Sequence, residues 1–210
     1  MITVIDYGMG NAGSIINILK QINVPVNITN KPSEIMLAKK LILPGVGAFD
    51  AGMSRLLEYG LVDALNQKVR IDHTPILGIC LGMQLFAQHS EEGSLPGLGW
   101  LNAHVKRFRF ENLDQQLTGR LRIPHMGWNE IQVVNQHPLL NGLESEARFY
   151  FVHAYYVHCQ QADIVLATTE YGFPFHSIIG QQNILGTQFH PEKSHRYGKQ
   201  LLTNFASLSA

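Results

Sequence analysis

Thr74-Pro-Ile-Leu-Gly-Ile-Cys80-Leu-Gly-Met-Gln84-Leu-Phe-Ala87 is the stretch that decides the fold of this chain. Pro75 precedes a continuous apolar run at 76–79, which predicts a short buried strand. After Cys80 the apolar residues recur at three- and four-residue spacing through Ala87, which predicts a helix. We therefore expect Cys80 to lie where a strand turns sharply into a helix.

The segment Gly78-Ile-Cys80-Leu-Gly82 is a G-x-C-x-G version of the nucleophile elbow. A strained turn exposes the nucleophile, and side chains at both flanking positions would collide with neighbouring backbone. The helix N-terminus behind Cys80 favours the thiolate, and the N–H of Leu81 is free to stabilise an oxyanion. The alternative is a small buried cysteine in a core strand, and this segment alone does not separate the two.

Composition limits the class of protein. The 210 residues suffice for one core, so we expect a single domain over residues 1–210. Lys+Arg and Asp+Glu are both 16, which gives no field for nucleic acid or an anionic membrane. Two cysteines are too few for a disulfide scaffold, and no apolar run reaches about 18 residues. With a strand and no basic region at the start, we expect a cytoplasmic protein without a secretory signal.

Strand and helix patterns alternate in the first half, whereas the second half is rich in strands. Strands are predicted near 2–5, 24–28, 41–43, 76–79, 100–109, 131–134, 149–153, 164–168, 175–179 and 184–189. Helices are predicted near 15–22, 53–60, 61–69 and 201–208, and Pro124–Asn129 is predicted as a turn. This organisation predicts one α/β domain with a mixed sheet.

Two glycine loops follow the early strands. Pro44–Gly47 can adopt an unusual backbone whose N–H groups face a cavity, a second candidate source of oxyanion donors. An ordinary strand-to-helix turn is the alternative. Gly8 and Gly10 match no phosphate-binding spacing, so we interpret them as a tight turn before a helix capped by Asn11 or Ser14.

A thiolate nucleophile needs a base, and the base needs an orienting group. His190 ends a predicted strand and Glu192 lies two residues on, so both side chains project to one side of an extended backbone that Pro191 stiffens. Taken singly, His190 is a capped strand-end residue and Glu192 a solvated charge. Together with Cys80 they have the logic of a catalytic triad.

The remaining histidines carry less information, because the chain has ten. His125 and His153 lie in distinctive segments and are candidates to line the site. Surface or packing roles are expected for His104, His137, His158, His176 and His195. No pair has a metal-ligand spacing, so we predict no metal and no cofactor. Cys159 lacks flanking glycines and is interpreted as a bystander.

Several motifs together resemble the class I (triad) glutamine amidotransferases. The class motifs are Pro44–Gly47, Gly78–Gln84 and Phe189–Glu192. Three further motifs, Tyr7–Asn11, Pro124–Asn129 and Phe151–Tyr155, resemble the glutaminase subunits of histidine biosynthesis within that class. The resemblance runs nearly end to end. It implies a flavodoxin-like α/β fold with a central, mostly parallel mixed sheet flanked by helices.

The resemblance also implies residue roles. Cys80 would attack the side-chain amide of glutamine, His190 would carry the proton to ammonia, and Glu192 would orient His190. The oxyanion hole would combine the N–H of Leu81 with a flipped Val46–Gly47 peptide, which implies poor activity until a partner acts. The glutamine backbone would be held by Gly47, Gln84, His153, Ala154 and Tyr155. Ala154 departs from the small hydroxyl residue usual there, so only a backbone contact survives.

A partner subunit is implied as well. The resemblance implies a heterodimer with a HisF-like (β/α)₈-barrel cyclase, which uses the ammonia to form imidazole glycerol phosphate and an aminoimidazole carboxamide ribotide (AICAR). The partner would meet Met9, Asn11, Met126, Trp128 and Lys193, although a lone Trp is more often core. Independently, little chain remains for an acceptor site once the elbow and triad are assigned.

Two alternatives remain open from the sequence. The segment Glu192–Gly198 resembles a paralogous branch whose members supply ammonia to surface-sugar amidation, with the same glutaminase chemistry. A non-catalytic binding subunit, or a stand-alone cysteine hydrolase, is the alternative from another class. The intact Cys80, His190 and Glu192 disfavour an inert protein.

Overall fold

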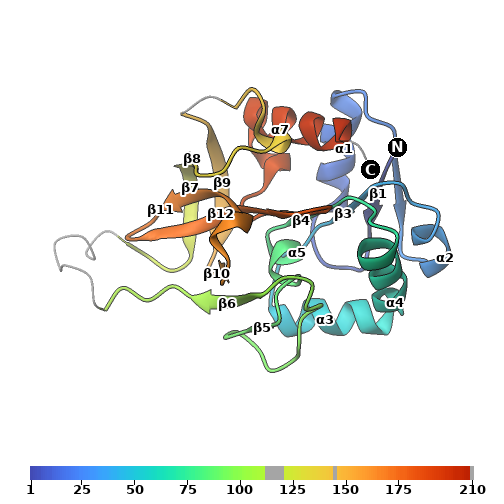
Figure 1. The fold of residues 1–210 in the computed structure, drawn as a ribbon, viewed down its shortest axis with the longest axis horizontal. Coiled ribbons are helices and arrows are strands. Elements are labelled where there is room, and N and C mark those ends of the chain that lie inside the picture. The colour runs from blue at the N-terminus through green and yellow to red at the C-terminus, as the bar shows by residue number, and fades with distance from the viewer. Residues whose placement is uncertain (112–120, 144–145, 209–210) are drawn as a thin grey trace.

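An eight-stranded mixed sheet forms the centre of the computed structural model, which describes residues 1–111, 121–143 and 146–208 (Figure 1). Its order is β2–β1–β3–β4–β13–β12–β11–β8. The parallel strands are β2 (Val26–Thr29), β1 (Ile2–Ile5), β3 (Leu41–Leu43), β4 (Ile76–Ile79) and β13 (Ile184–Thr187). The antiparallel strands are β12 (Pro174–Gln181), β11 (Val165–Glu170) and β8 (Gln132–Val133). The predicted α/β class with a mixed sheet is confirmed.

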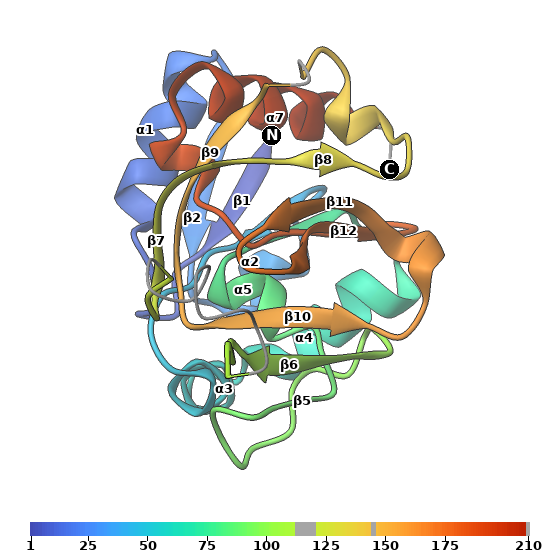
Figure 2. The same cartoon turned by 90° about the vertical axis from the view of Figure 1, so that its left-hand side faces the viewer.

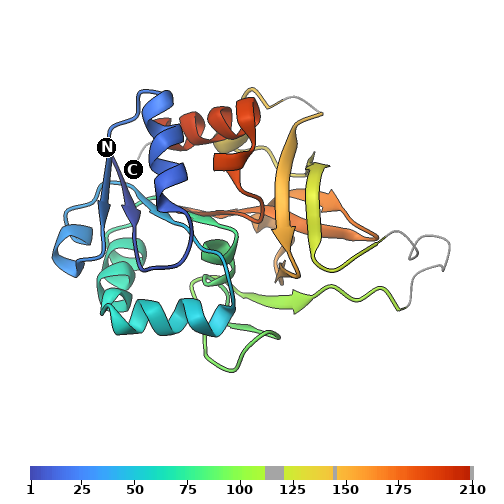
Figure 3. The same cartoon turned by 180° about the vertical axis from the view of Figure 1, so that it is seen from behind.

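Helices cover both faces of this sheet (Figures 1 and 3). One face carries α1 (Ala12–Gln21) and α7 (His195–Ser207); the other carries α3 (Phe49–Glu58) and α4 (Leu61–Asn66). The short helix α2 (Pro32–Ile35) precedes β3. Alternate residues of the apolar strands enter separate cores, since Leu41 and Leu43 pack in one cluster and Ile42 in the other. Strands buried on both faces explain why these runs are continuously apolar.

Two smaller sheets stand at one end of the central sheet (Figure 2). The first pairs β7 (His125–Glu130) with β9 (Arg148–His153), and the second has the order β10 (Tyr155–Cys159), β6 (Ala103–Arg107), β5 (His89–Ser90). The prediction of a turn at Pro124–Asn129 is therefore wrong. Gly127 has φ +135°, which explains the turn-like sequence, but residues 125–129 all pair with β9.

The predicted helices differ from the observed ones at two places. Helix α5 (Leu81–Gln84) has a single turn, although the pattern predicted helix to Ala87. Its continuation is blocked because backbone N–H groups of residues 98–101 bond the carbonyls of residues 85–87. Helix α4 continues as a π-helical turn at Gln67–Ile71. Short 3-10 turns occur at Pro138–Leu140, Ala162–Ile164 and Pro191–Lys193. None of the helices in the described ranges is long and apolar enough to cross a membrane.

Candidate active site

Cys80 lies where β4 turns sharply into α5, as the sequence predicts, at the carboxyl end of β4. Its backbone has φ 54° and ψ −108°, between β4 and α5. A Cβ at Gly82 would lie 1.9 Å from the carbonyl oxygen of Leu43, and one at Gly78 would lie 2.6 Å from the amide nitrogen of Met83. Both flanking positions therefore require glycine, because the elbow packs directly on neighbouring backbone.

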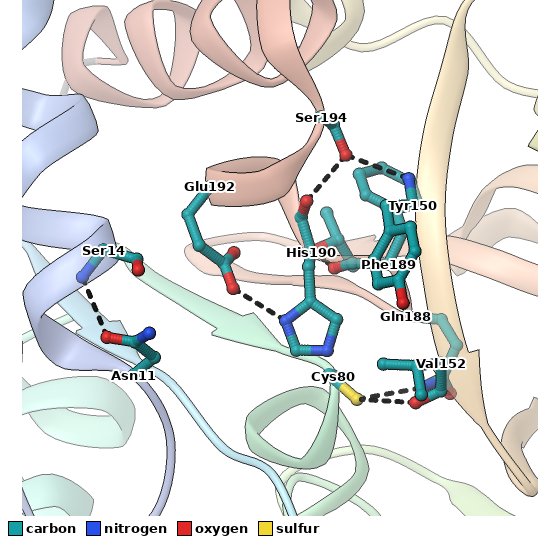
Figure 4. A network of polar contacts seen from close by, with 11 residues as sticks. Asn11, Ser14, Cys80, Tyr150, Val152, Gln188, Phe189, His190, Glu192 and Ser194 are labelled. Carbon is teal, nitrogen blue, oxygen red and sulfur yellow. Dashed lines mark hydrogen bonds and ion pairs between the residues drawn. The ribbon is translucent and has the colours of Figure 1, made fainter. Parts of the chain in front are cut away.

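His190 reaches Cys80 because β13 and β4 are parallel neighbours. The register places Thr187 opposite Ile79, and the N–H of Cys80 donates to the carbonyl of Thr187 at 2.8 Å. Residues that follow the two strands therefore meet at the same sheet edge, the usual position of a site in an open α/β sheet. In Figure 4 the His190 ring lies beside the sulfur of Cys80.

Glu192 orients the ring of His190. Its Oε1 lies 2.7 Å from Nδ1 of His190, and both side chains are almost fully buried. The turn between them is fixed by Ser194, whose hydroxyl donates to the carbonyl of His190 at 2.6 Å and accepts from the N–H of Tyr150 at 3.0 Å (Figure 4). The three predicted triad residues thus come together in the predicted order.

The charge state of His190 follows from these neighbours. Burial opposes the imidazolium, but hydrogen bonding and charge from Cys80 and Glu192 outweigh it and raise the pKa of His190 to about 10. Nε2 of His190 meets no hydrogen-bond geometry with any described residue, but it lies close enough to interact with the Cys80 side chain. At neutral pH the site therefore holds an imidazolium between a sulfur and a carboxylate, an arrangement suited to a cysteine nucleophile.

A cavity of about 440 Å³ opens in front of Cys80. It is lined by Val46, Gly47, Ala48, Cys80, Leu81, Gln84, Glu92, Pro124, Val152, His153, Ala154 and Tyr155. Every residue predicted for the oxyanion hole or for substrate binding is in that set. A second cavity of about 470 Å³ includes His73 and Leu208 in its lining, but none of these residues.

The predicted oxyanion donor is not free in this conformation. The N–H of Leu81 donates to the carbonyl of Gly45 at 3.3 Å, which is a long bond. Gly45 is pressed against the elbow, since a Cβ there would lie 2.8 Å from the amide nitrogen of Gly82. Gly47 has φ +104°, a conformation open to glycine. A rearrangement of residues 45–47 would therefore be needed to release the donor.

Gln84 and Glu92 bring polar groups to the cavity. The buried Gln84 donates from Nε2 to the carbonyl of Tyr155 at 3.0 Å. Glu92 was not predicted from the sequence, where it belongs to no motif. Its Oε2 accepts from the N–H of Phe49 at 2.9 Å, so the first turn of α3 holds this carboxylate at the cavity wall. Only the fold brings these segments together.

His153 lines the cavity and also positions the backbone beside it. Its Nδ1 lies 2.8 Å from the carbonyl of Tyr155, so this nitrogen is the donor, and its Nε2 accepts from Nδ1 of His125 at 3.1 Å. Burial, with the charge of His125 second, lowers the pKa of His153 to about 3, and burial lowers the pKa of His125 to about 4. The two rings are therefore neutral, and they fix the backbone at residues 153–155.

The predicted partner residues are mostly exposed. Met126 and Trp128 are 63% and 48% exposed on the outer face of β7, and the ring of Trp128 stacks on His195 at 5.1 Å. Trp128 is therefore not a core residue. Asn11 and Lys193 are exposed, while Met9 is half-buried. Asn11 also caps α1 as predicted, since its side chain accepts from the N–H of Ser14 at 3.0 Å (Figure 4).

Cys80, His190 and Glu192 therefore lie together, largely buried, at one edge of a mixed α/β sheet. The family model "Glutamine amidotransferase class-I" matches residues 3–208. A crystal structure described as a glutamine amidotransferase superimposes with a TM-score of 0.70 at 22% identity, covering 99% of each chain. The chain belongs to the class-I glutamine amidotransferase family.

Relatives within the family are more specific. A protein named "Imidazole glycerol phosphate synthase subunit HisH 2" from Methanococcus maripaludis is 51% identical over 205 residues, covering 98% of each chain. A protein of the same name from Pseudomonas aeruginosa is 46% identical over 208 residues, covering 99% of this chain and 100% of that protein.

Proposed function

We propose that this chain is the glutaminase subunit of an imidazole glycerol phosphate synthase. It hydrolyses L-glutamine to glutamate and ammonia, and the ammonia passes to a partner subunit in histidine biosynthesis. The observation that carries the proposal is the Cys80–His190–Glu192 triad beside a cavity of about 440 Å³. The family and the names of its relatives support the substrate and the pathway.

The reaction follows from the triad geometry. Sγ of Cys80 attacks the side-chain amide carbon of glutamine, and the C–N bond breaks as the thioester forms. The leaving nitrogen takes a proton from Nε2 of His190 and departs as ammonia. Water then attacks the thioester carbon and gives a proton to the neutral His190 ring; the C–S bond breaks with its electron pair returning to sulfur. Glu192 stabilises the imidazolium in both steps.

The cavity lining supports one orientation of glutamine. The carboxylate of Glu92 suits the α-ammonium group, while Gln84 and the main chain of Gly47 and residues 153–155 hold the rest of the backbone. The substrate amide oxygen would meet the N–H of Leu81 after the peptide near Val46 turns. Because that N–H is bonded to Gly45, the isolated chain would turn over slowly until a partner shifts this segment.

We propose a HisF-like (β/α)₈-barrel cyclase as the partner in a heterodimer. Met126 and Trp128 pair with Val152 and Tyr150 of β9, whose carbonyls contact Cys80 and His190. Their exposed apolar side chains therefore lie close to the triad and suit a protein interface. Asn11, Met9 and Lys193 complete the proposed contact. The reaction would take place in the cytoplasm, where two unpaired cysteines are kept reduced. The names of the relatives favour this acceptor over a sugar-amidation pathway.

The test is glutamate release from glutamine, measured with the chain alone and with the cyclase plus its ribonucleotide substrate. We expect slow turnover alone and a large increase with the complete partner. Cys80→Ala should abolish both activities, whereas Cys159→Ala, the matched control at the other buried cysteine, should leave them within about twofold. Stimulation by a different acceptor subunit only would reassign the pathway. Absence of turnover in every combination would reject the proposed glutaminase activity.

A further inference from the structure

The sulfur of Cys80 has a second side-chain neighbour that the triad does not include. Nε2 of Gln188 lies 3.8 Å from Sγ, and the carbonyl oxygen of Val152 lies 4.0 Å from it (Figure 4). The Gln188 side chain is completely buried. Its backbone is held as well, since its N–H donates to the carbonyl of Ser177 at 2.9 Å.

The orientation of the Gln188 amide is determined by its neighbours. The carbonyl of Tyr155 can only accept, so the Gln84 atom 3.0 Å away must be the NH₂ group. That same group donates to Gln188 at 3.2 Å, which assigns the facing atom of Gln188 as Oε1. The NH₂ group of Gln188 is therefore the part that faces the sulfur.

The two neighbours of the sulfur favour different protonation states. The carbonyl of Val152 is an acceptor, which suits an S–H group and repels a thiolate. The amide of Gln188 is a donor, which suits a thiolate. Burial removes the NH₂ group of Gln188 from water, so without the sulfur this donor would lose a hydrogen bond. The contact therefore stabilises both the buried donor and a negative charge on the sulfur.

We propose that Gln188 is a positioning residue that holds the Cys80 sulfur as a thiolate, acting with His190 from a different side. This deepens the proposed function, because the thiolate is the group that attacks glutamine. It also acts in thioester hydrolysis. As the C–S bond breaks, the electron pair returns to sulfur, and the N–H of Gln188 stabilises the departing Cys80 thiolate.

The test separates thiolate formation from glutamine turnover. The rate of alkylation of Cys80 by iodoacetamide is measured against pH in a Cys159→Ala background, with Gln188→Met as a shape-conserving variant without the donor. We expect the midpoint of that profile to move up by about one pH unit. With glutamine, kcat should fall about tenfold or more with KM nearly unchanged, since Gln188 does not line the cavity.

Two further variants make the result decisive. Gln188→Glu keeps an acceptor for Gln84 but places a carboxylate oxygen on the sulfur, so it should move the profile further in the same direction. Ser177→Ala, the matched control on the neighbouring strand, should leave the profile unchanged, because its hydroxyl has no partner among the described residues. An unchanged profile in folded Gln188→Met and Gln188→Glu would overturn the proposal. A shifted profile in a chain that does not hydrolyse glutamine would leave it standing and reject the proposed function instead.

Discussion

The two cysteines of this chain are buried to the same extent and are placed in opposite chemical surroundings. Cys80 and Cys159 are each 6% exposed, and neither forms a disulfide. Cys80 lies in a strained elbow with His190 and the Gln188 amide beside its sulfur. Cys159 ends the regular strand β10, where burial raises the pKa of its thiol to about 12. Burial alone therefore makes a cysteine inert, and the donors placed around it make it reactive.

The largest expected difference between these regions is in alkylation. At about pH 8, a thiol with a pKa of about 12 is ionised in only about one molecule in 10⁴. Cys80 has an imidazolium beside it at that pH, so we expect iodoacetamide to modify it about 10³-fold faster than Cys159 in the folded protein. Mass spectrometry of digested samples gives both rates at once. Comparable alkylation rates for Cys80 and Cys159 in the folded protein would remove the distinction.

Glu192→Gln should lower glutamine turnover at Cys80 without changing the shape of the site. An amide still fits beside His190, but the negative charge that helps raise the pKa of this histidine to about 10 is lost. We expect kcat for glutamine to fall by about 10²- to 10⁴-fold, with the alkaline limb of the pH profile moved to lower pH. Glu34→Gln, at an exposed ion pair with Lys31, is the matched control and should change neither. If Glu192→Gln kept the wild-type pH profile of kcat, a group other than Glu192 would be responsible for the raised pKa of His190.

Gly82→Ala tests whether the backbone or the side chains create the elbow. The new Cβ would lie 1.9 Å from the carbonyl oxygen of Leu43, so strand β3 or the elbow must move. We expect the free energy of unfolding to fall by about 3 kcal/mol and Cys80 alkylation to slow. Gly13→Ala is the control, because its nearest contact would be 3.5 Å and it lies in α1. That control should be neutral or stabilise by up to about 1 kcal/mol in chemical denaturation.

The sequence was informative where neighbours along the chain carry the signal. Two local patterns carry the triad: the glycines on either side of Cys80, and the two-residue spacing of His190 and Glu192. All three residues could therefore be predicted from the sequence. Gln188 could not, because its contact with sulfur depends on the register between β13 and β4. Glu92 was missed for the same reason, since its partner is the start of α3.

Backbone details were the second kind of information that the sequence lacked. The N–H of Leu81 was expected to be free, but a carbonyl of a distant loop, that of Gly45, occupies it. The segment at Pro124–Asn129 was expected to be a turn, because glycine and proline are typical of turns, but pairing with β9 overrides that preference. Tertiary hydrogen bonds decide both, and they have no local sequence pattern.

The smallest expected effect concerns the region of Cys159, whose N–H donates to Nδ1 of His176 at 3.1 Å. Burial, followed by the charges of His158 and Lys106, lowers the pKa of His176 to about 4. Since the folded pKa lies below that of the unfolded chain, the unfolded state binds more protons as pH falls below about 6.5, and stability decreases towards pH 4. His176→Gln keeps an acceptor for Cys159 but does not titrate, so it should lose less stability over this range.

We expect the difference between wild type and His176→Gln to reach about 1 kcal/mol between about pH 7 and pH 5.5, after allowance for the half-buried ring. Urea unfolding at both pH values measures it. The pH profile of glutamine turnover should be the same in the two proteins, because His176 does not line the cavity at Cys80. If His176→Gln moved that profile, the surroundings of Cys159 would be coupled to catalysis, and the second cysteine could no longer serve as an inert reference for the first.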